Sequence, residues 1–496
     1  MWHQSISSGP HTTYRVSNKL NMSRRRHGRG KLPTEPVSFE IESLSHEGRG
    51  IAHLDGKVAF VDGALAGEQV SAVYVRRRGR YDELKTIEVL SASLIRVAPP
   101  CEFAGLCGGC SLQHMDSDAQ IEFKQSVLLE QMQHATGQPA DKIELLPKLQ
   151  DATQFYRRKA RLAVRVVTKK GGALVGFREK YCSFIADMDD CKVLVEKVAV
   201  LIRPLRSLIT QLQGALNIPQ IEVAVGEESL NSEDTARSTS GDSNLQVALV
   251  FRHLQPLCEP DTQSLVQFAA EHGIQLYLQP GGNDTVHKIF PTDGVERLQY
   301  FLPEFDLQLN FHPMDFTQIN AGINRKIISQ ALSLLELSED DTVLDLFCGL
   351  GNFTLASARR AKKVVGVEGS QEMVLRGSEN ASFNGLENVE FHAADLFKPI
   401  ESKDWATAQY SKIILDPPRS GAIEIIPEIA KFGAKIIVYV SCNPATLARD
   451  TAELISAGYK LRATGVMDMF PHTTHVESMA VFDLGKRPHK EHSIKL

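Results

Sequence analysis

The stretch that decides the fold is Thr342–Phe353, TVLDLFCGLGNF, together with the later run Val364–Glu368, VVGVE. An apolar run ends in a glycine turn, and a second apolar run ends in an acid. This order is typical of a parallel sheet with helices on its faces. Apolar runs and helical patterns keep alternating from about residue 305 onward. Residues 306–496 are therefore predicted to form a Rossmann-like, doubly wound α/β domain.

The glycine turn indicates that a ligand binds at the edge of this sheet. Gly349 and Gly351 let the backbone approach a bound molecule, and Glu368 stands where it can bond a ribose diol. The G-x-G spacing lacks the third glycine of a dinucleotide fingerprint, which favours S-adenosyl-L-methionine over NAD. Asp395 follows another strand, Val389–Phe391, and is placed to meet an adenine. A ligand-free sheet with ordinary turns would leave both acids unexplained.

Three further motifs stand at the ends of later strands or just before one. Ile413–Leu415 precedes Asp416–Arg419 (DPPR), Lys435–Val440 precedes Ser441–Pro444 (SCNP), and Phe470–Glu477 spells FPHTTHVE. Sheets of this kind carry their chemistry at the carboxyl ends of the strands. A thiol and carboxylates in those places predict covalent catalysis.

Cys442 is the predicted nucleophile of this site. Cys348 competes for the role, but it lies inside the glycine turn, where a small apolar residue suits close packing. Only Cys442 is followed by Asn-Pro at the end of a later strand.

Length and composition bound the rest of the molecule. The chain has 496 residues, 43% of them apolar and 23% charged, with a net charge of −5. A multidomain globular protein is predicted. No run approaches the ~18 apolar residues of a membrane span, and the N-terminal region is too weakly apolar for a secretory signal. Eight cysteines are too few for a disulfide scaffold, so we expect a reducing compartment, the cytoplasm. We also expect a monomer with no obligate protein partner.

Residues 1–35 are predicted to be a basic, disordered arm. They carry seven Lys and Arg residues against the single acid Glu35. A mitochondrial transit peptide is the alternative, but glycines and prolines interrupt any amphipathic helix there. An RNA-contacting arm is favoured, because basic tails neutralise phosphates without a fold. Met22 is an alternative start.

Residues 36–96 alternate in period two between glycine turns, which predicts a small OB-like antiparallel β-barrel. Its basic stretch, Val75–Tyr81, is either a solvated edge strand or an RNA-binding surface. Residues 97–305 are predicted to be an α+β domain, with a helix at 116–136 and a mobile polar insert at 231–244. Within it, Phe155–Arg161 (FYRRKAR) suits stacked bases and phosphates, or is simply a solvated strand face.

A cysteine cluster predicts a metal site in this central region. Cys101, Cys107 and Cys110 have the spacing C-x5-C-x2-C, and a fourth ligand must come from farther along the chain. Cys191 is preferred for that place and Cys182 is second. Zinc is one candidate, although it prefers tight pairs on both sides and only one is present.

Taken together, these motifs resemble the S-adenosylmethionine-dependent RNA uracil-5-methyltransferases. DPPR, SCNP and FPHTTHVE match that family, as do Asp345–Gly349 (DLFCG) and Phe316–Asn320 (FTQIN). The resemblance covers essentially the whole chain from about residue 36. Transfer RNA enzymes of the family lack the cysteine cluster, and another ribosomal RNA member lacks the barrel. With both, the chain is similar to the bacterial 23S ribosomal RNA branch. The residues before Met22 and the insert depart from the family without touching a motif.

The resemblance carries further implications. It implies that the barrel is a TRAM domain and that segment 113–145 packs on the catalytic domain. It implies a [4Fe-4S] cluster rather than zinc, in a central iron–sulfur domain, on Cys101, Cys107, Cys110 and Cys191. It also implies a set of cofactor-binding residues: Gln318, Phe347, Asn352, Glu368, Asp395 and Asp416.

The chemistry assigns roles within the motifs. Carbon 5 of uracil is a poor nucleophile, and a thiolate from Cys442 added at carbon 6 makes it a carbanion. Glu477 is the candidate base for the carbon-5 proton, with a surface glutamate as the plain alternative. Asp416 is expected to bond the uracil edge or orient the cofactor. His472 and His475 are expected to shape the site.

The sequence therefore predicts methyl transfer to carbon 5 of a specific uridine in 23S ribosomal RNA, flipped out of its stack. A transfer RNA uracil-5-methyltransferase is the first alternative. A non-catalytic RNA-binding assembly factor is the second, and the intact Cys442 and Glu477 argue against it.

Overall fold

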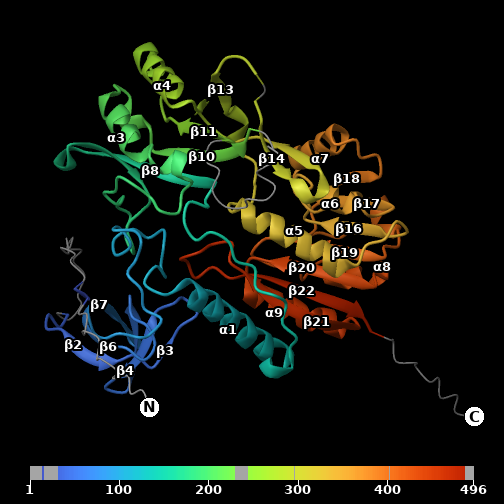
Figure 1. Ribbon diagram of the computed structural model, residues 1–496, viewed down its shortest axis with the longest axis horizontal. Helices are drawn as coiled ribbons and strands as arrows, with labels where there is room; N and C mark the ends of the chain where they lie inside the picture. Colours follow the sequence, from blue (N-terminus) through green and yellow to red (C-terminus); the bar gives the residue numbers. More distant parts are fainter. Residues whose placement is uncertain (1–13, 16–31, 229–243, 295, 401–402, 486–496) are drawn as a thin grey trace, which may run out of the picture. The chain divides into compact units, whose positions relative to one another are not determined.

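The protein is described by a computed structural model that covers residues 14–15, 32–228, 244–294, 296–400 and 403–485 (Figure 1). The predicted basic arm and polar insert fall almost entirely outside these residues. No helix in the described ranges is long and apolar enough to cross a membrane. Backbone contacts divide the chain into two compact units. The first comprises Met1–Gln120, Glu179–Ser183 and His472–Thr474, and the second comprises Ile121–Arg178, Phe184–Pro471 and His475–Leu496.

The first unit contains one sheet of short strands. Its order is β2-β6-β7-β5-β4-β3, with β1 pairing on β7. The strands are β1 (Tyr14–Arg15), β2 (Val37–Glu40), β3 (Ser43–Leu44), β4 (Gly50–Leu54), β5 (Lys57–Asp62), β6 (Gln69–Arg77) and β7 (Tyr81–Ser91). All neighbours are antiparallel except β5 and β7, which run parallel. Inward residues such as Ile41, Val61 and Val70 form its core, as the period-two pattern requires.

The basic stretch of this sheet pairs partly with its own neighbours. Arg76 lies 3.4 Å from Glu83, and Arg77 lies 3.5 Å from Asp82. Such pairs across strands are what a solvated edge needs. Arg78 follows these two residues and is exposed to solvent.

The second unit begins with a mixed sheet in the order β13-β12-β11-β10-β8-β9. Its strands are β8 (Lys159–Val167), β9 (Gly172–Gly176), β10 (Gln220–Glu227), β11 (Leu245–Arg252), β12 (Gln275–Gln279) and β13 (His287–Phe290). Helix α3 (Ile202–Gln211) packs on β9, α4 (Glu259–His272) packs on β12 and β13, and α2 (Glu196–Ala199) packs on β11. A hairpin of β14 (Leu298–Leu302) and β15 (Leu307–Phe311) follows.

The second sheet of this unit has the order β18-β17-β16-β19-β20-β22-β21. Its strands are β16 (Thr342–Leu346), β17 (Lys363–Glu368), β18 (Val389–Ala393), β19 (Lys412–Leu415), β20 (Ile436–Ser441), β21 (Tyr459–Met467) and β22 (Glu477–Leu484). The first five are parallel, as predicted. Only β22 departs from the all-parallel expectation, because it runs antiparallel to both β20 and β21. A short loop is enough to join antiparallel strands, so no helix separates β21 from β22.

Helices cover both faces of this sheet, and alternate residues of each strand feed two cores. Val343 and Ile414 pack with α5 (Ala321–Leu335), α6 (Thr354–Ala358) and α7 (Gln371–Phe383). Leu344 and Ile413 pack with α8 (Ile426–Phe432) and α9 (Pro444–Ser456). This alternation follows from the period of two in a strand.

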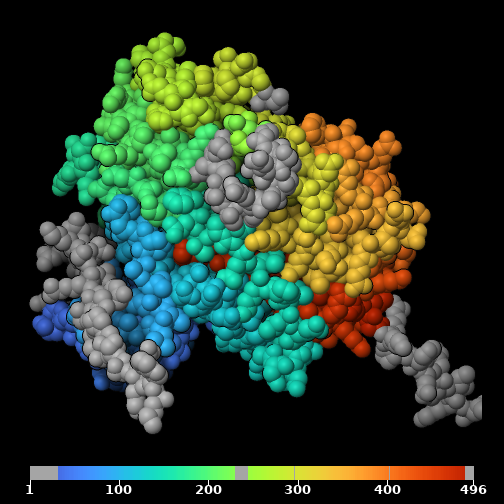
Figure 2. Space-filling view, in the orientation of Figure 1, coloured from blue at the N-terminus to red at the C-terminus, as the bar shows by residue number. Residues whose placement is uncertain are grey.

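Helix α1 (Ser117–Thr136) belongs to the second of these cores from residue 121 onward. Ile121, Leu128 and Met132 lie in the same apolar cluster as the buried residues of β20 and β22. Figure 2 shows the teal surface of this helix beside the red C-terminal strands. A segment from the first third of the chain thus covers one face of the C-terminal sheet.

Candidate active site

The predicted catalytic residues stand at three neighbouring strand ends. Asp416 directly follows β19, Cys442 directly follows β20, and Glu477 begins β22. In the β20–β22 ladder Ser441 pairs with Ser478, so the antiparallel register continues with Cys442 opposite Glu477. The fold therefore brings the thiol and the two carboxyl groups together.

This cluster has unusual proton affinities. Burial raises the pKa of Cys442 to about 11, and the carboxylates of Glu477 and Asp416 raise it further while Arg419 opposes them. Burial also raises the pKa of Glu477 to about 8, with Asp416 adding to the rise and Arg419 and Lys124 countering it. Burial raises the pKa of Asp416 to about 7. Near neutral pH the site consequently holds a thiol and two carboxyl groups poised to gain or lose protons.

The residues after Cys442 hold the DPPR loop in place. Asn443 caps α9 by accepting a hydrogen bond from the Ala445 amide (3.1 Å), and its Nδ2 donates to the Arg419 carbonyl (3.0 Å). Pro444 occupies the first helical position, where its missing N–H costs nothing. The Asn-Pro pair thus starts a helix and fixes the neighbouring loop.

The buried carboxylate of Asp450 also holds the loop that follows β19. Asp450 accepts hydrogen bonds from the Ala422 amide (2.7 Å) and the Tyr439 hydroxyl (2.6 Å), and Arg449 Nε donates to it at 2.8 Å. Arg449 Nη2 also donates to the Ser420 carbonyl (2.8 Å). These contacts limit how far the Asp416 loop can move.

Sequence reasoning missed the residue that holds the FPHTTHVE segment. Lys124 of α1 is fully buried, and its Nζ donates to Asp468 Oδ1 (2.6 Å) and to the Phe470 carbonyl (3.0 Å). The available signal was a lysine within the apolar stripe that includes Ile121 and Leu128. His475, on the same segment, is exposed and lies 3.5 Å from Arg419.

The predicted ribose and adenine ligands stand at the next strand ends. Glu368 ends β17 and accepts hydrogen bonds from the amides of Gly349 and Ser370, each at 3.1 Å. Asp395 follows β18, is exposed, and pairs with Lys398 at 2.9 Å. The glycine turn therefore lies directly against Glu368.

The glycine turn itself shows which residues face a ligand and which face the core. Phe347 has a left-handed backbone (φ 66°) and its ring lies 5.8 Å from that of Phe397. Cys348 is buried, and burial raises its pKa well above the usual range. Cys348 is thus a packing residue without thiolate character.

Of the other two predicted cofactor residues, Gln318 lines a pocket within the second unit and Asn352 bonds to two residues that line it. Gln318 lines it together with Tyr300 and Asn324. Asn352 lies behind them, accepting from the Tyr300 hydroxyl (2.9 Å) and exchanging two hydrogen bonds with Asn324 (2.9 and 3.1 Å).

Asp345 is a second residue that sequence reasoning left without a role. It lies in β16 just before the glycine turn, is fully buried, and accepts from Thr354 Oγ1 at 2.6 Å. Among the residues that the structure describes, its Oδ1 has no hydrogen-bond partner. Burial raises its pKa to about 7, with Asp416 and Glu368 adding to the rise. A Cβ on Gly349 would meet nothing closer than 3.9 Å, so the backbone of the glycine turn is open at that residue.

The predicted metal ligands are divided between the two units. Cys101, Cys107 and Cys110 belong to the first unit and Cys191 to the second. Within the described residues, no group of three or more Cys, His, Asp or Glu side chains is arranged to hold a metal ion. The described residues do not fit a preformed centre, and the iron–sulfur cluster stays a prediction.

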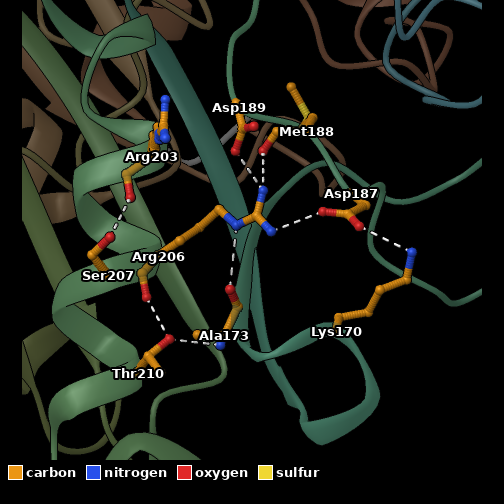
Figure 3. Close-up of polar contacts among 9 residues, drawn as sticks. All are labelled: Lys170, Ala173, Asp187, Met188, Asp189, Arg203, Arg206, Ser207 and Thr210. Atoms are coloured by element: carbon orange, nitrogen blue, oxygen red, sulfur yellow. Dashed lines mark hydrogen bonds and ion pairs between the residues drawn. The ribbon is translucent and has the colours of Figure 1, made fainter.

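The segment that leads to Cys191 is held by one arginine of α3. Figure 3 shows the Arg206 guanidinium between Asp187, Met188 and Asp189. It donates to Asp187 Oδ1 (2.8 Å), to the Met188 carbonyl (3.0 Å) and to Asp189 Oδ1 (2.6 Å). A guanidinium with several donors suits this bridging role.

The aromatic and basic run 155–161 makes contacts inside the protein. Arg158 pairs with the buried Glu227 at 2.5 Å, and Arg161 pairs with Glu222 at 2.5 Å. Lys159 donates to the Asp315 carbonyl. These cations hold neighbouring elements together, which favours a structural role for the run over direct phosphate binding.

Comparisons with known proteins agree with this geometry. The sequence model described as tRNA (Uracil-5-)-methyltransferase matches residues 292–484, and the TRAM domain model matches residues 34–72. The 23S rRNA (uracil(1939)-C(5))-methyltransferase RlmD of Hahella chejuensis is 52% identical over 466 residues, which is 93% of this chain and 100% of that protein. Its counterpart from Alcanivorax borkumensis is 51% identical, covering 94% of this chain and 100% of that protein.

A solved structure supports the fold. The Pyrococcus abyssi tRNA (uracil-54, C5)-methyltransferase, in complex with S-adenosyl-L-homocysteine, aligns with a TM-score of 0.65 and 23% identity. The alignment covers 90% of this chain and 100% of that one. With 52% identity to a curated member over 93% of its length, the chain belongs to the RlmD family of 23S ribosomal RNA (uracil-C5)-methyltransferases.

Proposed function

We propose that this protein transfers a methyl group from S-adenosyl-L-methionine to carbon 5 of a uridine in 23S ribosomal RNA, by way of a covalent adduct on Cys442. The observation that supports the proposal is the antiparallel register of β20 and β22: Ser441 pairs with Ser478, so the next residues, Cys442 and Glu477, lie opposite each other. A thiol that adds to a ring and a carboxyl that removes a proton are the two groups the reaction requires.

The first step joins Cys442 to the base. The sulfur adds to carbon 6, the ring electrons move onto the carbon-4 oxygen, and carbon 5 becomes nucleophilic. Because the pKa of Cys442 is raised to about 11 by burial and the nearby carboxylates, the thiol proton must leave as attack proceeds. Asp416 is the neighbouring group that accepts it, which leaves Glu477 free to take the carbon-5 proton later, and Arg419 supplies the positive charge that stabilises the thiolate.

The second step separates product and enzyme. S-adenosyl-L-methionine, when bound, supplies the methyl group that carbon 5 acquires. The carbon-5 proton then passes to the Glu477 carboxylate, the electrons restore the ring double bond, and the sulfur departs. The uridine must be flipped out of its stack to reach Cys442.

The cofactor site follows from the groups around the glycine turn. We assign Glu368, at the end of β17, to the ribose diol and Asp395, after β18, to the adenine. The unpartnered Oδ1 of Asp345 suits the positive charge of the cofactor's methionine moiety. Gln318, Phe347, Asn352 and Asp416 complete the proposed set.

A [4Fe-4S] cluster on Cys101, Cys107, Cys110 and Cys191 is the remaining part of the proposal. Three clustered thiols and a fourth from a distant segment suit iron–sulfur ligation, and the single tight pair argues against zinc. No step of the methyl transfer depends on it.

Methyl transfer to purified 23S ribosomal RNA and to purified transfer RNA, with the modified uridine mapped, tests the function. We expect label only in 23S RNA and a complete loss with Cys442→Ala, while cofactor affinity stays within a few-fold. Methylation confined to transfer RNA would overturn the substrate, and turnover by Cys442→Ala would overturn the covalent step.

A further inference from the structure

Lys124 has an environment that an ordinary helix-packing residue does not have. Its side chain has no exposed surface, and its partner Asp468 is only 3% exposed. A buried ion pair of this kind stabilises little by itself, because both charges lose their hydration. A buried lysine within an otherwise apolar helix face therefore suggests a role beyond packing.

The contacts of Lys124 converge on the end of β21. The 2.6 Å bond to Asp468 and the 3.0 Å bond to the Phe470 carbonyl hold the chain just after that strand. Asp468 is held from its other side, since its amide donates to the Leu149 carbonyl at 2.8 Å. The Tyr156 hydroxyl donates to the next carbonyl, Pro471, at 3.1 Å. The loop that delivers Glu477 to the start of β22 thus leaves β21 from a fixed point.

Lys124 also places a positive charge near the proposed base. Four groups face Glu477: Asp416 and Arg419 from the loop after β19, Cys442 from the end of β20, and Lys124 from α1. Arg419 is exposed to solvent, which weakens its field, whereas Lys124 is shielded from water. Lys124 is therefore the one buried cation among these groups.

We propose that Lys124 is a positioning residue for the proton-transfer step: it fixes the end of β21 through Asp468 and Phe470, and it places a positive charge that favours the carboxylate form of Glu477 against the effect of burial. This inference rests on the proposed function, because it assigns Lys124 a task in the second step of that reaction.

An RNA-free titration tests the electrostatic half of this inference. Lys124→Met combined with Asp468→Asn removes the ion pair without leaving a buried unpaired charge. The infrared band of the protonated Glu477 carboxyl is isolated by subtracting the spectrum of the same protein carrying Glu477→Gln. We expect the pKa of Glu477 to rise by roughly one unit, because a nearby cation has been lost. An unchanged pKa would overturn the inference.

Two further variants serve as controls, one in case the double variant does not fold and one for effects of altered helix packing. Lys124→Gln keeps a donor for Asp468 but removes the charge, and it should raise the pKa in the same direction even if the double variant fails to fold. Lys148→Met breaks a different ion pair to α1, with the exposed Glu122, and should leave the pKa of Glu477 unchanged. A shift of the same size in Lys148→Met would mean that α1 acts only through global packing.

Single-turnover assays with 23S RNA test the positioning half. Methyl transfer should proceed in the double variant, whereas release of the methylated RNA from Cys442 should slow, with its pH dependence displaced upward by the same unit. Equal slowing of both steps would overturn the assignment. If the unaltered protein transfers no methyl group to 23S RNA, the proposed function fails by that result, and the infrared titration still decides the role of Lys124.

Discussion

At the scale of single residues, the site works with groups whose proton affinities have been moved by burial. Asp345, Asp416 and Glu477 all sit among apolar side chains or one another, and each has a raised pKa. Burial penalises the charged form of a carboxyl group. Protonation of these three acids therefore stabilises the folded protein. The proposed reaction needs at least one of these carboxyl groups in its charged form, which is the form that destabilises the folded protein.

Glu477→Gln should allow the first steps of the proposed reaction and block the last one. Cys442 can still attack and the methyl group can still arrive, but an amide cannot take the carbon-5 proton, so the sulfur cannot leave. A methylated RNA–protein adduct should accumulate and survive denaturing electrophoresis, and it should be absent when Cys442→Ala is added. Normal turnover, or inactivity with no adduct, would make Asp416 the next candidate base.

The pH dependence of the unaltered protein follows from the same group. The carboxylate form of Glu477 grows as pH rises through about 8, the pKa to which burial raises it. Breakdown of the adduct in single-turnover assays should therefore accelerate between pH 6.5 and about 8.5 and then level off. A rate that is flat across this range would show that another group accepts the proton.

Asp345→Asn should make stability less dependent on pH. The folded pKa of Asp345 is about 7, above its ordinary value of 3.8, so the unaltered protein loses stability as pH rises from about 4 to 7. At ~1.4 kcal/mol per pKa unit, a rise of about 3 units corresponds to a loss of roughly 4 kcal/mol. Urea unfolding of the cofactor-free protein at pH 5.5 and 8 should show a smaller difference for the variant. An equal difference in both proteins would contradict the burial of a titrating Asp345.

At the scale of elements, the start of α9 links helix stability to the shape of the active site. Asn443 has two roles, since its oxygen caps the helix and its Nδ2 holds the Arg419 carbonyl. A substitution that separates the two roles tells which one matters for catalysis.

Asn443→Asp and Asn443→Ala form that pair of variants. Aspartate retains the cap but cannot donate to Arg419, so its unfolding temperature should stay near that of the unaltered protein while methyl transfer falls at least tenfold. Alanine should lose the cap as well, at a cost of about 1 kcal/mol. Calorimetry and initial-rate assays provide the measurements. Full activity in Asn443→Asp would mean that the contacts of Asp450 alone hold the loop.

At the scale of the whole molecule, the cysteines raise a separate question. Three lie in one compact unit and the fourth in the other, and the described side chains do not converge on a metal position. The chemical composition of the purified protein therefore tests the proposed cluster.

Protein purified without oxygen should be brown and contain iron and sulfide. Cys107→Ser should bleach it, because a serine hydroxyl does not replace a thiolate ligand. Cys258→Ser is the matched control, because Cys258 lies outside the proposed ligand set. This variant should retain the colour. Stoichiometric zinc without iron would overturn the iron–sulfur proposal.

Much of this protein can be predicted from the sequence, because several decisive signals are local. A strand must end where DPPR and SCNP begin, and a glycine turn after an apolar run sets the sheet type and the edge where ligands bind. The first five strands of the C-terminal sheet were predicted in this way, whereas the TRAM domain was implied by the resemblance to a known family. The antiparallel return of β22 was not, since strand direction depends on what the chain does between two strands and leaves no mark within either.

Other features depend on the tertiary structure alone. Lys124 and Asp468 are 344 residues apart, and the sequence around either residue does not indicate that the two form an ion pair. The proton affinities of Asp345 and Glu477 likewise have no local cause, because they arise from burial and from charges that distant segments bring together. The sequence by itself determined which reactive groups stand at the strand ends. Only the packed structure decided which charges face them, because electrostatic fields in a protein depend on distance and solvent exclusion and not on order along the chain.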